Sequence, residues 1–236
     1  MSDAVLQIDG TDASPRIVLT CEHASNRIPA PYAWPDADRW LVHTHWAWDP
    51  GAAHVARMLA KRFGAPAVLS RFSRLLVDPN RDLESETLFR HVADDRRVEL
   101  NHALSDEEKA HRIEMLYKPY HDAVDAMVAA HDAVVVSVHS FTPTYEGQPR
   151  SVEVGVLHDS QPELGQAVRR ALEPYYDARD NEPWDGRKGL MFGPQSHADN
   201  HGRQAVEFEI RQDLATDPRW RGEFVDRVVG VLNRLV

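Results

Sequence analysis

The chain has 236 residues, of which 42% are apolar and 27% charged, and its formal net charge is −10. This length and composition are ordinary for one globular domain with a sizeable core, and the negative charge argues against nucleic acid or an anionic membrane as a partner. Cys21 is the only cysteine, which excludes an internal disulfide and a zinc site made of several thiolates.

The N-terminal segment, residues 1–10, lacks the basic start and the apolar run of a signal peptide. No stretch of the sequence approaches the run of about 18 apolar residues that a membrane-spanning helix needs. We therefore expect a cytoplasmic protein whose residues 1–236 form a single domain.

A strand and a helix are predicted in the first quarter of the chain. Residues 16–21 form an apolar, β-rich run that leads into the polar loop 22–26, which is typical of a buried strand at the edge of an α/β active site. A helix is expected from residue 49 to about residue 63, with Asp49 as its N-cap and Gly64 closing it.

The middle of the chain predicts short strands, a charged excursion and a long helix. Residues 65–70 are predicted as a strand, and residues 75–77 as a third strand or a continuation of it. Residues 81–101 are charged and weakly patterned, which indicates a surface excursion. A capping box at residues 105–108 begins a long helix that Pro119 should kink or split.

The second half predicts the central strand of the sheet. Residues 133–138 are apolar on both faces, as expected of a buried central strand. The remaining predicted elements are strands at 152–157 and 204–210, a helix at 162–172, a long functional loop at 175–200, and a final helix capped by Asp217 and Pro218. This order predicts a three-layer α/β/α fold, in which a mixed, mostly parallel sheet carries helices on both faces.

Three residues that can bind a metal follow predicted strands or begin a helix. His23 comes directly after the first strand, Asp49 starts the first helix, and His139 ends the central strand. Since the carboxyl ends of parallel strands and the amino ends of helices share one rim of the sheet, these side chains can meet there. Two histidines, one carboxylate and a water molecule are a standard catalytic zinc site.

Each of these residues also has a purely structural explanation. Asp49 could serve only as a helix cap, His23 could be an exposed loop residue, and His139 could be a satisfied core histidine. Taken together at one predicted rim, they favour a metal site. Zinc is the expected ion, although other divalent ions accept the same ligands.

The last predicted strand carries two glutamates. Glu207 and Glu209 alternate with apolar residues, so both point to the same face. A carboxylate on a strand inside an α/β protein is costly unless it is paired or used, and zinc hydrolysis needs a carboxylate that moves a proton from water to the leaving nitrogen. We expect Glu209 to be this catalytic base. The alternative, that both glutamates pair with Arg203 or Arg211, stays open.

Five short motifs, in chain order, resemble those of the N-formylglutamate amidohydrolase family. They run from about residue 16 to residue 214 and comprise Cys21-Glu22-His23-Ala24-Ser25, Trp48-Asp49-Pro50-Gly51-Ala52, Ser73-Arg74 with Val77-Asp78-Pro79-Asn80-Arg81, Val138-His139-Ser140-Phe141-Thr142-Pro143, and Val206-Glu207-Phe208-Glu209-Ile210-Arg211-Gln212-Asp213-Leu214. The resemblance implies a phosphorylase/hydrolase-like fold of the zinc-peptidase kind. Carried over by motif, the zinc ion falls to His23, Asp49 and His139, and the base to Glu209.

The first motif departs from the form typical of the family's histidine-degradation enzymes. Those enzymes read Pro-His-Ser-Gly, whereas this chain has Glu22-His23-Ala24-Ser25. We therefore expect the fold and the zinc chemistry to transfer better than the substrate.

Substrate contacts are expected from polar residues near the predicted rim. Arginine binds a carboxylate through two parallel hydrogen bonds, and Arg74 and Arg81 match the family's arginine positions. The alternative for these arginines is an ion pair with Asp78 or Asp82. The expected substrate contacts are Arg74, Asn80, Arg81, His201 and Arg211.

The expected substrate is a small N-acyl amino acid, with N-formyl-L-glutamate as the type substrate. Two alternatives remain: an amidase or peptidase that acts on cell-wall or other peptide amides, and a metal- or acid-binding module without catalysis. His197 and His201 could chelate a second metal only on a helix, and Gly193, Pro194 and Gly202 argue for a loop instead.

Overall fold

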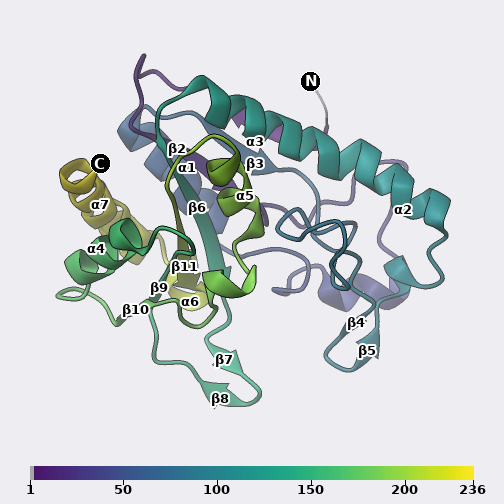
Figure 1. Cartoon of the computed structure of the whole chain (residues 1–236). Coiled ribbons are helices and arrows are strands. Elements are labelled where there is room, and N and C mark those ends of the chain that lie inside the picture. The colour runs from purple at the N-terminus through teal and green to yellow at the C-terminus, as the bar shows by residue number, and fades with distance from the viewer. Residues whose placement is uncertain (1–2) are drawn as a thin grey trace.

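Seven strands of the computed structural model, which describes residues 3–236, form one sheet (Figure 1). Their order is β1-β3-β2-β6-β11-β9-β10. The pairs β2–β3, β2–β6, β6–β11 and β9–β10 are parallel, whereas β1–β3 and β9–β11 are antiparallel. The strands are β1 Val5–Ile8, β2 Ile17–Cys21, β3 Ala67–Ser70, β6 Val134–Phe141, β9 Val154–Leu157, β10 Ala178–Asp180 and β11 Ala205–Arg211. The sheet is therefore mixed and mostly parallel, as predicted.

Helices cover both faces of this sheet. Helices α1, α4 and α7 pack on one face, and α3 and α5 pack on the other (Figure 1). The helices are α1 Ala52–Phe63, α2 Asp106–Arg112, α3 Lys118–Ala130, α4 Pro162–Leu172, α5 Phe192–Asn200, α6 Gln212–Thr216 and α7 Pro218–Leu235. The three-layer arrangement confirms the predicted fold class. No helix within residues 3–236 is long and apolar enough to cross a membrane.

Three smaller kinds of element complete the described chain. Short hairpins are formed by β4 Val92–Ala93 with β5 Arg96–Arg97, and by β7 Thr144–Tyr145 with β8 Gln148–Pro149. Short 3₁₀ helices span Asp36–Leu41, Glu99–Asn101 and Gly186–Lys188, and a π-helical turn spans Ile113–Tyr117. The π turn ends two residues before Pro119, which cannot donate a backbone hydrogen bond, so the regular α-helix is interrupted as expected.

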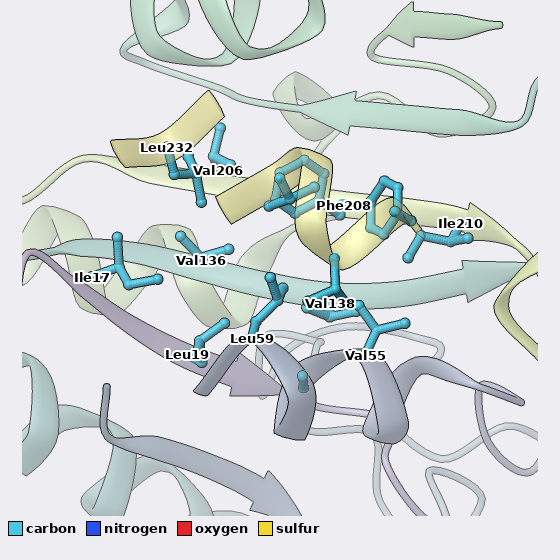
Figure 2. Packing of buried hydrophobic residues seen from close by; sticks show 14 of the residues in the cluster. Ile17, Leu19, Val55, Leu59, Val136, Val138, Val206, Phe208, Ile210 and Leu232 are labelled. Carbon is cyan, nitrogen blue, oxygen red and sulfur yellow. The ribbon is translucent and has the colours of Figure 1, made fainter. Parts of the chain in front are cut away.

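The two faces of the central strands differ in chemistry. Toward α1 and α7, the strands present an unbroken apolar set that includes Val136, Val138 and Phe208 (Figure 2). Toward α3 and α5, the same strands begin apolar at Val135 and Ala205, but polar side chains follow toward their carboxyl ends. Because side chains alternate along a strand, these polar residues share one face, and they form the candidate site.

Two predicted elements are wrong. Residues 75–77 form a buried turn and no strand, because their apolar side chains pack into two neighbouring clusters without joining a ladder. The predicted long loop at 175–200 contains strand β10 and helix α5. Pro194 is tolerated there because it lies in the first turn of α5, where backbone N–H groups have no partner within the helix.

Candidate active site

His23, Asp49 and His139 come together at the carboxyl end of the sheet. Each residue is buried, and one ligand atom of each lies within 4.8 Å of the others. His139 Nδ1 is 2.9 Å from Asp49 Oδ2, and His23 Nδ1 is 3.5 Å from the same oxygen. The backbone also ties the group together, because Asp49 N donates to the carbonyl oxygen of His23 over 2.9 Å.

This group fits a divalent cation. Two ligand atoms about 2.1 Å from one ion in tetrahedral geometry lie about 3.4 Å apart, close to the two distances to Asp49 Oδ2. Moreover, His23 Nδ1 is buried and has no hydrogen-bond partner among the described residues. A buried ring nitrogen that faces a carboxylate without a partner is the arrangement that a metal ion would satisfy.

Asp49 does not cap helix α1. The N-cap is Gly51, whose φ of 89° places it in the left-handed region, and the Asp49 side chain turns instead toward the histidines. Its Oδ2 also accepts a hydrogen bond from Ser140 N over 3.1 Å. Burial raises the pKa of Asp49, but His23 and His139 outweigh burial, and the pKa falls below its usual range. Asp49 is therefore an ionised carboxylate, as a metal ligand must be.

Asp78 contacts the second ring nitrogen of His23. His23 Nε2 lies 2.7 Å from Asp78 Oδ1, on the side of the ring away from Asp49. Asp78 is held in turn by Arg74, whose Nε and Nη2 donate to Oδ2 over 2.9 and 2.6 Å, and by Asn80 N over 2.9 Å. Burial raises the pKa of Asp78, but Arg74 and then His23 bring it well below the usual value.

Glu22 makes the equivalent contact with the second ring nitrogen of His139. It is fully buried, and its Oε2 lies 2.9 Å from His139 Nε2 and accepts from Ser137 Oγ over 2.6 Å. Tyr120 OH on helix α3 donates to Oε1 over 2.9 Å. Burial raises the pKa of Glu22, but these hydrogen bonds, led by the one from His139, lower it to about 2.

Glu22 was not predicted as a site residue, and Asp78 was considered only as an ion-pair partner of Arg74 or Arg81, which it is for Arg74. The alternation along β2 contained a signal for Glu22, which shares the parity of Val18 and Thr20 and so faces α3. For Asp78, which lies in a loop, the only signal was its place in a family motif.

Glu207 and Glu209 lie on strand β11 and face the same side, as predicted. Glu209 is directly opposite His139 in the parallel pairing with β6. Burial raises the pKa of Glu207 to about 8, and burial also raises that of Glu209 well above its usual value. Both Glu207 oxygens and Glu209 Oε2 are buried without a hydrogen-bond partner in the part of the chain that the structure describes.

Neither glutamate is paired with the arginines considered above. Arg203 pairs with Asp132 at 2.7 Å, and Arg211 pairs with Asp213 at 2.8 Å. Glu209 lines the cavity together with His23, Asp49 and His139, whereas Glu207 does not. The two glutamates therefore differ in access to a bound substrate.

A cavity of about 310 Å³ opens over this group. Its volume is at the lower end of the range for small-molecule sites. Its wall carries cationic, aromatic and acidic side chains. The lining residues are His23, His45, Trp46, Asp49, Arg74, Asn80, Arg81, Arg90, His139, Ser140, Phe141, Thr142, Tyr145, Trp184, Leu190 and Glu209.

The cavity contains three of the five predicted substrate contacts. Arg74 lines it while also pairing with Asp78, so both roles considered for Arg74 are compatible with its position. Asn80 lines it and binds the first turn of α5, because its Oδ1 accepts from Gly193 N over 2.8 Å. Arg81 donates to the carbonyl oxygen of Asn80 and to Thr87 Oγ1, over 2.7 and 3.2 Å.

Arg90 is a lining residue that the sequence analysis missed. Its guanidinium lies over the Trp46 ring, 4.8 Å from the ring centroid. Neither Arg81 nor Arg90 forms an ion pair with a carboxylate among residues 3–236. Two guanidinium groups in one cavity without a protein counter-ion can attract an anionic ligand.

His201 and Arg211 lie outside the cavity. His201 Nε2 is 2.9 Å from Asp125 Oδ1 on helix α3, and Arg211 Nη1 donates to the carbonyl oxygens of Arg150 and Ser151. Both side chains are thus held by structural partners. His197 is on a helix after all, but it also contacts Asp125, and His23, Asp49 and His139 are the one group within residues 3–236 whose ligand atoms converge as a metal requires.

Comparisons with known proteins agree with this architecture. The model of the family described as N-formylglutamate amidohydrolase matches residues 15–216. The gene product Atu2144 from Agrobacterium tumefaciens is 33% identical, with a TM-score of 0.89 over 98% of this chain and 95% of that one. No curated protein matches the sequence.

More distant structures share the fold. An N-formylglutamate amidohydrolase from Ralstonia eutropha JMP134 has a TM-score of 0.72 at 18% identity, over 99% of this chain and 98% of that one. A bacteriophage poly-gamma-glutamate hydrolase has a TM-score of 0.50 at 12% identity, over 98% and 89%. These likenesses confirm the fold that the sequence motifs implied.

Proposed function

Because the chain belongs to the N-formylglutamate amidohydrolase family, we propose that it hydrolyses the amide bond of an N-acyl amino acid, with N-formyl-L-glutamate as the type substrate. One observation carries this proposal. The carboxyl group of Glu209, with one oxygen unpartnered among the described residues, lines the same cavity as the His23, Asp49 and His139 group.

The proposed cofactor is Zn²⁺, held by His23, Asp49 and His139. Two imidazoles and one carboxylate are typical ligands of catalytic zinc, which binds water or substrate as its fourth ligand. A divalent ion held there supplies Lewis acidity, which polarises the acyl carbonyl and lowers the pKa of a water molecule.

Glu209 is the proposed general base and acid. Burial raises its pKa well above the usual value of a glutamate, and carboxyl groups with raised pKa values are typical of general acids and bases. It accepts a proton from the attacking water molecule. It then gives that proton to the nitrogen that leaves when the C–N bond breaks, so the base is regenerated in each turnover.

Arg81 and Arg90 are the proposed contacts to the substrate carboxylate. Both guanidinium groups line the cavity and lack a protein carboxylate partner within residues 3–236. Arg74 donates two hydrogen bonds to Asp78, so we expect it to contribute less to substrate binding than Arg81 and Arg90 do. Asn80 lies beside Arg81 and can orient the substrate amide.

The test is Glu209→Gln with the zinc content measured. We expect zinc to be retained and the turnover of N-acyl amino acids to fall by about 100- to 10,000-fold, because general acid–base catalysis contributes about that much. Glu207→Gln is the comparison on the same strand and face. Glu207 does not line the cavity, but its Oε2 lies 3.6 Å from His139 Nε2, so this variant should change zinc content more than the turnover of the zinc-loaded protein. Unchanged turnover in Glu209→Gln with zinc bound would contradict the proposal.

Cavity size favours a small substrate over a long peptide. A peptidase or cell-wall amidase needs a groove that admits several residues, and a cavity of about 310 Å³ suits an N-acyl amino acid. A panel of N-acyl amino acids and muropeptides separates these two substrates. Stoichiometric zinc without turnover on either class would instead favour a binding module.

A further inference from the structure

The two histidines of the site are held in the same way. Each ring turns Nδ1 toward Asp49 and Nε2 toward a second carboxylate on the opposite side. For His139 that second carboxylate is Glu22, and for His23 it is Asp78. Three carboxylates and two imidazoles thus form a continuous row, with Asp49 in the middle.

Glu22 can only accept hydrogen bonds in this row. It is fully buried, and its three recorded side-chain partners are the donors Tyr120 OH and Ser137 Oγ and the ring nitrogen His139 Nε2. Because both oxygens of Glu22 already accept hydrogen bonds from hydroxyl groups, the hydrogen between Glu22 and His139 is on Nε2. A neutral His139 then has its lone pair on Nδ1, which faces Asp49.

Asp78 constrains His23 in the same way. Its Oδ2 is occupied by Arg74 Nε and Nη2, and its Oδ1 faces His23 Nε2 at 2.7 Å. Because Oδ2 accepts two hydrogen bonds from Arg74 and Oδ1 accepts one from Asn80 N, the proton at the contact with His23 belongs to the ring. The lone pair of His23 is therefore on Nδ1, the atom without a hydrogen-bond partner among the described residues.

We propose that Glu22 and Asp78 are positioning residues that fix the tautomer and the ring orientation of His139 and His23, so that both rings present Nδ1 to the cation. The proposal rests on the proposed function only in placing a divalent cation among His23, Asp49 and His139. Metal-binding histidines commonly donate their other N–H to a carboxylate, and loss of that partner costs about 10- to 100-fold in metal affinity.

The first test measures Zn²⁺ affinity of the full chain by calorimetry in a buffer without substrate. Glu22→Gln and Asp78→Asn keep the side-chain shape and remove the charge, and each should weaken zinc binding about 10- to 100-fold. Asp180→Asn is the matched control, because Asp180 Oδ1 lies 2.7 Å from His158 Nε2, outside the cavity. It should leave zinc affinity within twofold of the unsubstituted protein.

A second measurement reports the ring atoms directly. In protein labelled with ¹⁵N-histidine and loaded with zinc, His23 and His139 should each show a metal-bound Nδ1 and a protonated Nε2. Metal bound through Nε2 of either ring would overturn the proposal. A role in folding alone would not fix the tautomer, so this readout separates positioning from simple stabilisation.

A variant that keeps the Glu22 carboxylate extends the test of its positioning role. Tyr120→Phe removes one donor to Glu22 and leaves the carboxylate in place, so it should weaken zinc binding less than Glu22→Gln. If Glu22→Gln does not fold, Asp78→Asn and the ¹⁵N spectra decide. Zinc affinity within twofold in both carboxylate variants would also overturn the proposal. Because no substrate is used, failure of the amidase assay and failure of this inference are distinguishable.

Discussion

The ring of His139 faces a carboxylate at each nitrogen, Asp49 at Nδ1 and Glu22 at Nε2. Burial lowers its pKa, but the neighbouring carboxylates, led by Glu207, outweigh burial and raise the pKa well above the usual value. Without a metal, the imidazolium supplies the positive charge that this cluster of acids needs. A bound cation would supply that charge in its place, with a proton released from Nδ1.

The raised pKa of Glu207 makes the stability of the folded chain depend on pH. Its pKa is raised to about 8 by burial, whereas glutamate in an unfolded chain titrates near about 4.3. Between these values the unfolded chain has lost the proton and the folded chain has kept it. The free energy of unfolding therefore decreases as pH rises from about 4.3 to about 8.

Glu207→Gln should remove this dependence, because glutamine does not titrate. In metal-free protein, the melting temperature of the variant relative to the unsubstituted chain should increase from pH 5 to pH 8. The shift should correspond to a few kcal/mol, since one unit of pKa difference is worth about 1.4 kcal/mol. Thermal unfolding at several pH values measures it, and a difference that stays constant with pH would contradict the assignment.

Among the helices and strands, those with continuous or regularly spaced apolar residues were predicted best from the sequence. The apolar runs at β2, β6 and β11 were identified, and their shared rim brought His23, Asp49 and His139 together as expected. Helix α5 was missed because its apolar residues do not follow one face, and because Pro194 looked like an interruption when it lies in the first turn. Local sequence could not reveal this helix, since contacts with β6, β11 and α3 hold it.

The residues that line the cavity were harder to predict than the group of His23, Asp49 and His139. Strand ends and helix starts place His23, Asp49 and His139, whereas Arg90 lies in the charged excursion at 81–101, where no pattern indicated a direction. His201 was expected to contact the substrate, but its Nε2 lies 2.9 Å from Asp125 Oδ1. The long flexible side chains of a loop take their direction from tertiary neighbours, which a single sequence does not contain.

Gly51 gives a prediction about the join between α1 and α6. Its φ of 89° disfavours any residue with a side chain, and an added Cβ would lie 2.5 Å from the carbonyl carbon and oxygen of Ala215. Gly51→Ala should therefore lower the free energy of unfolding by about 2–4 kcal/mol, from backbone strain plus displacement of α6.

The matched control is Gly222→Ala in helix α7. An added Cβ at Gly222 meets no atom within 4 Å among the described residues, and alanine favours a helix over glycine by about 1 kcal/mol. This variant should be slightly more stable than the unsubstituted chain. Urea denaturation of both variants compares the two effects, and equal stability of the two would contradict the steric argument.

For the whole molecule, charge is distributed unevenly. The net charge is −10, yet the cavity is lined by Arg74, Arg81 and Arg90. An anionic substrate is repelled by the surface at long range and attracted inside the cavity, where the dielectric constant is lower. Salt screens the long-range repulsion more than the contacts in the cavity. The expected cytoplasmic location and single-domain organisation stay predictions.

Metal removal should destabilise the whole fold. A ligand that binds only the folded state adds about 2.7 kcal/mol at 100 times its dissociation constant, which for a chain of this size is about 5–10 °C in melting temperature. Thermal unfolding of chelator-treated protein, with and without added Zn²⁺, measures this shift. Mg²⁺ is the control, because it prefers oxygen ligands and should have a much smaller effect. Equal melting temperatures with and without zinc would contradict the metal site.

Glu22 and His23 are consecutive residues that serve different histidine–carboxylate pairs. Glu22 contacts the ring from β6, whereas His23 faces Asp49 and is held from behind by Asp78. The spacing between β2 and this dipeptide therefore admits no insertion or deletion. Deleting a single residue there would place the His23 ring where the Glu22 carboxylate now lies, and both contacts would be lost. The length of this segment is therefore constrained as well as its residue types.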